Sequence, residues 1–394
     1  MKPPVLIEIC DFERFPTGGQ LTFARNLLNA WGPELALIGC EAGNAAAPSG
    51  EWTKKTIDGR SFDFFSLGNV RNPERKSLIP RRVWGFFRML LHRKKLRLEE
   101  YSDIIISAPE ILFTLPASVL ERTTIIIPGL ENPLRISRYF YAKWFAGLYD
   151  VLLYRRLAKL KRVLAAADRR EIAAFAAASH GRLAADRVTM FPTCYPENIF
   201  HPMDRAEVRR KLGIPAGAAM VVTVGRIGRY KGWRFMLDAF AGFAASERDA
   251  RFYLVGDGED SNELAAAVGE PGLAGKVFPL GRRPPEEVAE LLAAADLFIM
   301  GSYKEGWCTA LVEAVACGTP CCVTDFSSAA EMVRDGVNGF VVPGRDEKLF
   351  AEKMAEAVAL PASGAVSAAE RIREFGVSKL KMKLAAAIGR SREK

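Results

Sequence analysis

The chain has 394 residues, of which 49% are hydrophobic, so it is long enough for two domains that each bury a core. No apolar run reaches the ~18 residues that a membrane-spanning helix needs, and seven irregularly spaced cysteines do not form a disulfide framework. The start MKPPVLIEIC lacks the pattern of a signal peptide, so we expect a cytoplasmic protein.

The net charge of +9 is concentrated in the first half of the chain. Residues 1–195 carry 29 Lys and Arg against 19 Asp and Glu, whereas the remainder carries 26 against 27. Ten basic residues and a single Glu fall within residues 71–97. So local an excess indicates a surface for an anionic partner.

In chain order, the first half alternates apolar runs with helical patterns. VLIEIC (5–10) precedes a glycine pair and the helical GQLTFARNLLNAW (19–31). Further buried strands are predicted at ELALIG (34–39), DIIIS (103–107) and TTIIIP (123–128). A helical stretch without proline covers about residues 136–166. The turn-rich FPTCYPENIFHP (191–202), with three prolines, predicts an inter-domain linker.

The second half repeats the alternation more regularly. Its predicted strands are MVVTVGR (220–226), RFYLVG (251–256), KVFPLG (276–281), DLFIMG (296–301), CCVTD (321–325) and FVV (340–342). Helical patterns separate them, which predicts parallel sheets with helices on both faces. The expected fold is α/β, with two doubly wound domains that face a cleft. The domains would be 1–195, joined by a returning C-terminal helix at 376–394, and 196–375.

Two glycine-containing turns follow strands of the second half. VGRIGRYKG (224–232) places Arg226 and Lys231 just after a strand, and two cations beside glycines suit a bound diphosphate. Such loop charges are also often only solvated. VGDGED (255–260) is weaker evidence for a ligand site, since any tight turn between a strand and a helix can have such a sequence.

Two carboxylates stand in the apolar stretch EGWCTALVE (305–313). A helix is expected from near Trp307 to Gly318, so eight residues would separate Glu305 and Glu313 by about 12 Å. That exceeds the roughly 5–9.5 Å of glycosidase carboxylate pairs, so the two would hold different parts of one elongated ligand. With an anion at the helix start between them, that ligand would be a nucleotide sugar. The alternative to a ligand site is that Glu313 is a surface residue and that Glu305 is only a charge at the start of the helix.

These residues resemble a known family. EGWCTALVEAVACGTPCCVTDFSSAAEMVRDGVNGFVV (305–342) is similar to the E-x7-E signature of retaining family-4 glycosyltransferases, which have two Rossmann-like domains in the GT-B architecture. The resemblance includes VGRIGRYKG, LVGDGED and ADLFIMGS and extends over about 195–345. In the first half the clearest similarity is FPTGGQLTFARNLL (15–28).

The resemblance implies roles for individual residues. Arg226 and Lys231 would hold the donor diphosphate, Glu305 the donor hexose and Glu313 the ribose hydroxyls. The other donor-binding residues would be Gly18 and Gly19 of the glycine loop and Trp307, Cys308 and Thr309 at the helix start. Many members have a histidine after a mid-domain strand, but here that region reads TTIIIPGLENP (123–133), so we assign no catalytic histidine.

The implied activity is transfer of a hexosyl group from a nucleotide diphosphate sugar with retention of configuration, without cofactor or bound metal. Arg226, Lys231 and Glu305 would be the catalytic residues, and the acceptor would enter from the first domain. Two alternatives stay open: a nucleotide-sugar epimerase of the same architecture, and a sugar-nucleotide-binding module without catalysis.

The basic stretch mixes cations with aromatic residues in a helical pattern, which is typical of helices that lie on an anionic membrane. The residues expected to face the membrane are Arg81, Arg82, Trp84, Phe86, Phe87, Arg88, Arg93, Lys94 and Lys95. The alternative is a core-facing helix with a basic solvated face. No nucleic-acid recognition motif accompanies the charge. A peripheral enzyme on the inner face of the cell membrane, with a glycan or lipid-linked acceptor of lipopolysaccharide or polysaccharide synthesis, is therefore predicted.

Overall fold

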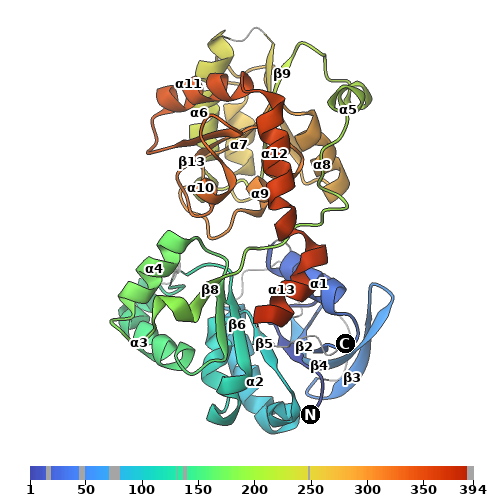
Figure 1. Ribbon diagram of the computed structural model, residues 1–394, viewed down its shortest axis with the longest axis vertical. Coiled ribbons are helices and arrows are strands. Elements are labelled where there is room, and N and C mark those ends of the chain that lie inside the picture. Colours follow the sequence, from blue (N-terminus) through green and yellow to red (C-terminus); the bar gives the residue numbers. More distant parts are fainter. Residues whose placement is uncertain are drawn as a thin grey trace. The chain divides into compact units, whose positions relative to one another are not determined.

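The computed structural model describes residues 1–14, 19–43, 49–70, 80–130, 132–135, 140–246 and 249–387. The chain divides into two compact units, which are shown in Figure 1. The first unit is Met1–Cys194 together with the segment that starts at Val377, and the second is Tyr195–Gly376. The boundaries predicted at 195/196 and 375/376 lie one residue from these.

The first unit is built on an eight-stranded sheet in the order β3-β4-β2-β1-β5-β6-β7-β8. Its strands are β1 (Val5–Ile7), β2 (Ala36–Ala42), β3 (Trp52–Ile57), β4 (Arg60–Val70), β5 (Ile104–Ile106), β6 (Thr123–Ile127), β7 (Arg162–Ala165) and β8 (Val188–Met190). All neighbours pair in parallel except β3 and β4, which form an antiparallel hairpin at one edge.

Helices cover both faces of this sheet. The α-helices are α1 (Gly19–Trp31), α2 (Arg81–Leu96), α3 (Ala146–Leu157), α4 (Arg169–Ala178) and α13 (Val377–Ala387). The 3₁₀ helices are η1 (Leu98–Glu100), η2 (Pro109–Thr114), η3 (Ala117–Arg122), η4 (Phe140–Phe145) and η5 (Ala185–Arg187). The predicted helix over 136–166 is wrong in part, because its end RVLA forms the buried strand β7.

Alternate residues of each strand feed two different cores, because successive side chains of a strand point to opposite faces. Val5 and Ile7 pack with residues of α2 and α3, whereas Leu6 packs with residues of α1 and α13. Leu380 and Leu384 of α13 are fully buried in this second core. The returning C-terminal helix is therefore confirmed, and it lies against α1 (Figure 1).

The second unit has six parallel strands in the order β11-β10-β9-β12-β13-β14. The strands are β9 (Ala219–Val224), β10 (Ala250–Val255), β11 (Val277–Gly281), β12 (Leu297–Met300), β13 (Cys321–Thr324) and β14 (Gly339–Val342). The helices are α5 (Arg205–Leu212), η6 (Arg229–Lys231), α6 (Trp233–Ser246), α7 (Ser261–Ala267), α8 (Pro285–Ala294), α9 (Thr309–Ala316), α10 (Ala329–Met332), α11 (Glu347–Val358), α12 (Ala362–Ile372) and η7 (Arg373–Phe375).

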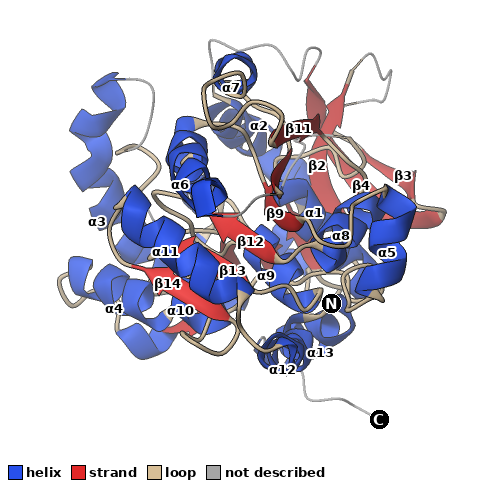
Figure 2. Cartoon of the chain, turned by 90° about the horizontal axis from the view of Figure 1, so that it is seen from above, coloured by secondary structure: helices blue, strands red, loops and turns tan. Residues whose placement is uncertain are grey.

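Figure 2 shows α6 and α11 on one side of the strands of this sheet and α8 and α9 on the other. The chain first builds outward from β9 through β10 to β11 and then returns to place β12 on the other side of β9. At such a reversal of strand order the loops after the strands diverge and leave a ligand crevice at the carboxyl edge. The α/β fold with two Rossmann-like units, predicted from the alternation, is confirmed.

Glycines let the loops after β9, β10 and β12 approach one another backbone to backbone. At Gly256 (φ 137°) a Cβ would lie 1.8 Å from the carbonyl oxygen of Gly225, and at Gly232 (φ 68°) it would lie 1.9 Å from that of Gly301. Neither position can hold a larger residue without moving the neighbouring loop. This contact brings the residues after β9 beside those after β12.

We expect Gly232→Ala to destabilise the protein far more than Gly213→Ala. Both glycines end a helix in the left-handed region, at φ 68° and 67°, but nothing lies within 4 Å of a Cβ at Gly213. Gly213→Ala should therefore cost only the backbone strain of about 1 kcal/mol, and Gly232→Ala at least about 3 kcal/mol, measured by chemical denaturation. Equal losses would contradict the close approach.

Candidate functional site

Lys231 and Glu305 form an ion pair at the reversal of strand order in the second unit. Lys231 ends η6, after β9, and Glu305 lies in the loop between β12 and α9. The Nζ atom of Lys231 lies 2.6 Å from Oε1 of Glu305. Tyr303 donates its N–H to the carbonyl of Tyr230 at 2.8 Å, which fixes the two loops together. The structure thus brings together two residues that were predicted to share a site.

One carboxylate oxygen of Glu305 is available to a ligand. Ser302 donates its hydroxyl to the same Oε1 atom at 2.5 Å. Within the described residues both contacts fall on Oε1, so Oε2 is left to accept hydrogen bonds from a ligand. Burial opposes the charge of Lys231, but the neighbouring Glu305 carboxylate outweighs it, and the pKa of Lys231 is raised. Lys231 is therefore a fixed cation at neutral pH.

Arg226 lies in the same loop as Lys231 but has a different partner. Its Nε donates to Oε2 of Glu259, in the loop after β10, at 2.7 Å. The two side chains are 70% and 50% exposed, and an ion pair so exposed contributes little stability. An incoming phosphate could therefore displace Glu259 at little cost. Glu259 was not predicted, because nothing in VGDGED distinguishes it from a solvated loop charge.

The start of α9 differs from the prediction in detail. The helix begins at Thr309 and not near Trp307, and the N–H of Cys308 donates to Ser328 Oγ at 3.2 Å. An anion would therefore meet the N–H groups of Thr309 and Ala310, which have no carbonyl in a preceding turn. Four helical residues separate Thr309 from Glu313, a rise of about 6 Å, so the predicted 12 Å of continuous helix between the glutamates is wrong.

Trp307 and Cys308, which were predicted to bind the donor through the N–H groups of the helix start, have buried side chains. Trp307 is 6% exposed and packs edge-on against Phe375, with ring centroids 5.7 Å apart. Cys308 is 2% exposed, and burial raises the pKa of its thiol to about 12. The two side chains pack inside the protein, and the role of the N–H groups at this helix start stays a prediction.

Glu313 lies in the second turn of α9 and is the most unusual carboxylate of the site. It is half-buried, and burial raises its pKa to about 8. No side chain of the described residues donates a hydrogen bond or an ion pair to it. A carboxyl group in such a place stays protonated at neutral pH unless a ligand supplies donors.

Arg345 was not predicted, because no motif in its loop marks it as a site residue. It follows β14, donates Nη2 to the carbonyl of Gly301 at 2.7 Å, and lies over the ring of Tyr303 at 3.2 Å from the centroid. Burial lowers its pKa. Its planar guanidinium thus supports the loop between β12 and Glu305 from behind.

The remaining predicted site residues are placed as follows. Gly18 lies outside the described residues, and Gly19 is the first residue of α1. Thr309 is half-buried at the first position of α9. His92 is buried in α2 against Phe65, and His180 and His201 are exposed. In the part of the chain that the structure describes, no group of three or more His, Cys, Asp and Glu is placed to hold a metal ion.

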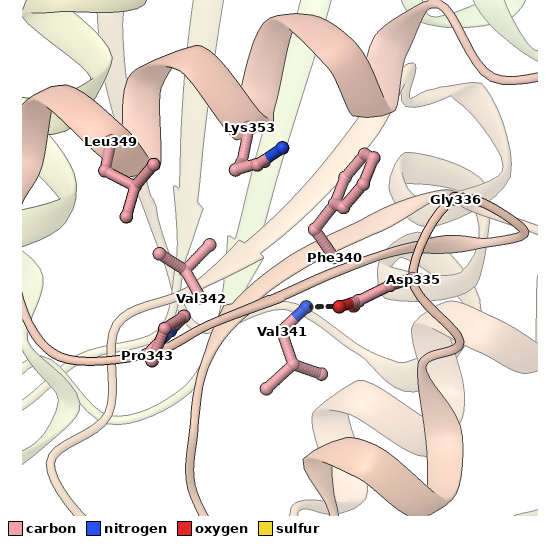
Figure 3. Close-up of a pocket in the computed structure, with 8 residues that line it drawn as sticks. All are labelled: Asp335, Gly336, Phe340, Val341, Val342, Pro343, Leu349 and Lys353. Atoms are coloured by element: carbon pink, nitrogen blue, oxygen red, sulfur yellow. Dashed lines mark hydrogen bonds between the residues drawn. The ribbon is translucent and has the colours of Figure 1, made fainter.

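A pocket of about 380 Å³ lies elsewhere in the second unit, beside the edge strand β14 and α11 (Figure 3). Its charges are already satisfied within the protein. Asp335 accepts the N–H of Val341 at 2.8 Å, and Lys353 pairs with Glu356 at 2.7 Å. The pocket therefore lacks the exposed polar groups that a charged ligand needs.

The basic helix α2 presents only part of the predicted membrane face. At least four of its nine predicted residues contact other parts of the protein, and Arg82 is one of them. Trp84 packs against the core, Arg88 donates to the carbonyl of Leu67, and burial lowers the pKa of Arg81. Met89, another apolar residue of the same basic stretch, is buried on this side of the helix.

The other predicted residues of α2 lie nearer to solvent. Phe87 is 61% exposed, and Phe86 packs edge-on against it. Arg93, Lys94 and Lys95 are exposed, whereas Arg82 pairs with Glu110 at 3.2 Å. Among the described residues, no helix combines the length and apolar character that crossing a bilayer would require.

Comparison with solved structures identifies the fold. The fold is that of GT-B glycosyltransferases: sucrose-phosphate synthase from Thermosynechococcus elongatus has a TM-score of 0.74 at 18% identity, with 98% of both chains covered. WaaG, a glycosyltransferase involved in lipopolysaccharide biosynthesis, has a TM-score of 0.69 at 18% identity, with 98% of this chain and 100% of WaaG covered. Anabaena Alr3699/HepE in complex with UDP-glucose has 0.68 at 18%, with 98% and 99% covered.

Comparison with known sequences matches the second unit to a protein family. Residues 204–376 match the family described as Glycosyl transferases group 1, so the second unit is a domain of that family, as its motifs predicted. The D-inositol 3-phosphate glycosyltransferase of Thermobispora bispora is 33% identical over 212 residues, which are 51% of this chain and 50% of that protein. The N-acetyl-alpha-D-glucosaminyl L-malate synthase of Bacillus anthracis is 30% identical over 145 residues, 37% of each. The chain thus matches half or less of the length of these curated relatives.

We expect Glu313→Gln to remove part of the pH dependence of stability. With a folded pKa of about 8 and an unfolded pKa near ~4.3, the folded state holds a proton that the unfolded state has lost between these values. Stability then falls as pH rises through that window. Because Gln copies the neutral form, the variant should melt roughly 3–8 °C above the wild type at pH 8 but close to it at pH 5. Parallel pH profiles of the two melting temperatures would contradict this assignment.

Proposed function

We propose that the protein is a metal-independent glycosyltransferase that moves a hexosyl group from a nucleotide diphosphate sugar to an acceptor hydroxyl with retention of configuration. The single observation that carries the proposal is the Lys231–Glu305 pair at the reversal of strand order, with a carboxylate oxygen directed to no protein group of the described chain. The family of the second unit supports it, as do relatives that are themselves glycosyltransferases.

In this proposal each residue meets a different part of the donor. Lys231 and the first N–H groups of α9 take the negative charge of the diphosphate, and Glu305 accepts hydrogen bonds from the hexose hydroxyls. Arg226 exchanges Glu259 for a phosphate oxygen. Glu313 accepts the two ribose hydroxyls, whose donors favour its ionised form.

Transfer breaks the bond between the anomeric carbon and the diphosphate oxygen and forms a bond from that carbon to the acceptor oxygen. The bonding electron pair leaves with the diphosphate oxygen, and the proton of the acceptor hydroxyl passes to that departing phosphate or to water. The products are the glycosylated acceptor and the nucleoside diphosphate. Negative charge develops on the leaving diphosphate, and Lys231 is fixed next to it before the reaction starts. Such preorganised charges lower the barrier because they need no reorganisation.

We expect Lys231→Ala to lower the rate of transfer by about 10²-fold or more, as the loss of a transition-state charge partner does elsewhere. The measurement is release of nucleoside diphosphate from a panel of nucleotide sugars, with and without a lipid extract as acceptor. The matched control is Lys304→Ala, because Lys304 is an exposed lysine in the loop between β12 and α9. Near-normal turnover of purified Lys231→Ala would show that the assigned role is wrong.

The same assay separates the rival functions. An epimerase would interconvert nucleotide sugars without releasing nucleoside diphosphate. A module that only binds would be stabilised by nucleoside diphosphate, through mass action, without turnover of any nucleotide sugar. Acceptor-dependent release supports the transferase.

We propose further that the acceptor is a membrane-associated glycan or lipid-linked molecule of cell-envelope polysaccharide or lipopolysaccharide synthesis, used at the inner face of the cell membrane. The exposed part of α2 supports this, since Phe87 and Leu91 lie beside Arg93, Lys94 and Lys95. Exposed aromatic and aliphatic side chains next to cations are typical of surfaces that enter an anionic bilayer interface.

We expect the protein to co-sediment with vesicles that contain phosphatidylglycerol and much less with phosphatidylcholine alone. Because the attraction is electrostatic in part, high salt should weaken it. Equal sedimentation with both vesicle types would rule out the anionic membrane surface. The outcome is independent of the donor assay.

A further inference from the structure

Exposed apolar side chains of the first unit gather on two elements. Of the fourteen large hydrophobic side chains exposed in the described residues, eight lie on α2 and on the continuous segment formed by η4 and α3. They are Val83, Phe87, Leu90 and Leu91 on α2, and Trp144, Phe145, Leu148 and Leu152 on η4 and α3. The sequence around the second group, 138–162, mixes cations with aromatic residues as the stretch of α2 does.

The two groups face away from the same side of the sheet. Met89 and Leu96 of α2 pack into the same core as Leu153 and Leu157 of α3. The 3₁₀ helix η2 contacts both helices, through the Arg82–Glu110 ion pair and through the ring of Phe113, which lies 5.7 Å from that of Tyr149. The outward faces of α2 and α3 are therefore parts of one surface layer of the first unit.

The exposed stripe of α3 changes from apolar to basic along its length. Trp144, Leu148 and Leu152 follow one another at intervals of four residues, and Arg155, Arg156 and Lys159 continue the same side of the helix. At this end the structure has a pocket of about 490 Å³, lined by Phe113, Leu152, Arg155, Arg156, Ala158, Lys159 and Arg182. Four cations and two large apolar side chains thus meet in one place.

No carboxylate lines this pocket, and in the described part of the chain none pairs with its four cations. The nearby cation Arg135 differs, since it pairs with Asp150 at 2.9 Å. Arg182 is oriented by its own backbone contact, a hydrogen bond from Nη1 to the carbonyl of Ser179 at 3.1 Å. Uncompensated cations beside apolar side chains match a ligand that is anionic at one end and apolar at the other.

We infer that this pocket binds the phosphate head group of an anionic phospholipid while Trp144, Leu148 and Leu152 enter the acyl boundary of the bilayer. The inference extends the membrane-associated acceptor proposed above, and it assigns the anchoring to η4 and α3 in addition to α2. The simpler reading is that cations near a helix end only complement the helix dipole. That reading predicts an effect on stability and none on lipid binding.

Trp144 provides a built-in probe of the inference. All six tryptophans lie in described residues, and Trp144, at 77% exposure, is the exposed one, whereas Trp31, Trp233 and Trp307 are buried and Trp52 and Trp84 are half-buried. Vesicles that contain phosphatidylglycerol should shift the fluorescence of the full-length protein to the blue. The Trp144→Phe substitution should abolish the fluorescence shift. The variant protein should still sediment with the vesicles, because Phe remains apolar.

Charge reversal tests the pocket itself. The double variant Arg155→Glu, Arg156→Glu should bind phosphatidylglycerol vesicles at least about 20-fold more weakly, since each basic residue near an anionic surface contributes several-fold to binding. Arg60→Glu, an exposed arginine on β4 near the opposite edge of the same sheet, should cause a markedly smaller loss. Unchanged melting temperatures in both variants establish that folding is intact.

Three results overturn the inference: no blue shift with anionic vesicles, an equal loss for the Arg60 control, or undiminished binding by the double variant. Arg155→Gln, Arg156→Gln decides the case if charge reversal unfolds the protein. Stabilisation by a panel of nucleoside diphosphates, expected of the second unit in the proposed function, is measured on the same samples. If no nucleoside diphosphate stabilises any of them, the donor proposal fails, while the vesicle data still decide the pocket.

Discussion

The candidate site depends on the direct approach of two backbones. Gly232 and Gly301 are so close that no side chain fits between the loops after β9 and β12. Because of this contact, a lysine and a glutamate that are 74 residues apart lie 2.6 Å from one another. The loops follow strands at the carboxyl edge of the parallel sheet, and the close approach of Gly232 and Gly301 determines which side chains of these loops meet. Arg345 and Tyr303 then hold the second loop from behind, so the ion pair is fixed by packing as well as by charge.

The site treats its two glutamates in opposite ways. Glu305 accepts hydrogen bonds from a cation and from a hydroxyl. Glu313 is given no protein donor among the described residues, and burial holds its proton. Desolvation of a carboxyl without a partner costs free energy that only a ligand can recover. Two carboxylates in one apolar stretch thus have separate tasks, which agrees with one ligand that has hydroxyl groups at both ends.

Much of this arrangement could be read from the sequence, because strand and helix periods are local. Every strand predicted in the second half exists, and the motifs placed Lys231 and Glu305 in one site, although their ion pair was not predicted. The start of a helix was harder to predict. α9 begins at Thr309, two residues later than its pattern suggested, and the side chains of Trp307 and Cys308 are buried just before it. Glu259 and Arg345 come from loops whose sequences contain no distinguishing signal. In α2 the helical period was evident, but which side faced the sheet depended on contacts with Leu67 and the core.

The route of the chain through the two units has a consequence for biosynthesis. The first unit is interrupted by the second and is completed only by α13, whose Leu380 and Leu384 close the core beside α1. During synthesis on the ribosome, the second unit, residues 195–376, is made as one continuous segment before α13. The first unit can therefore complete the core beside α1 only after the whole second unit has been synthesised.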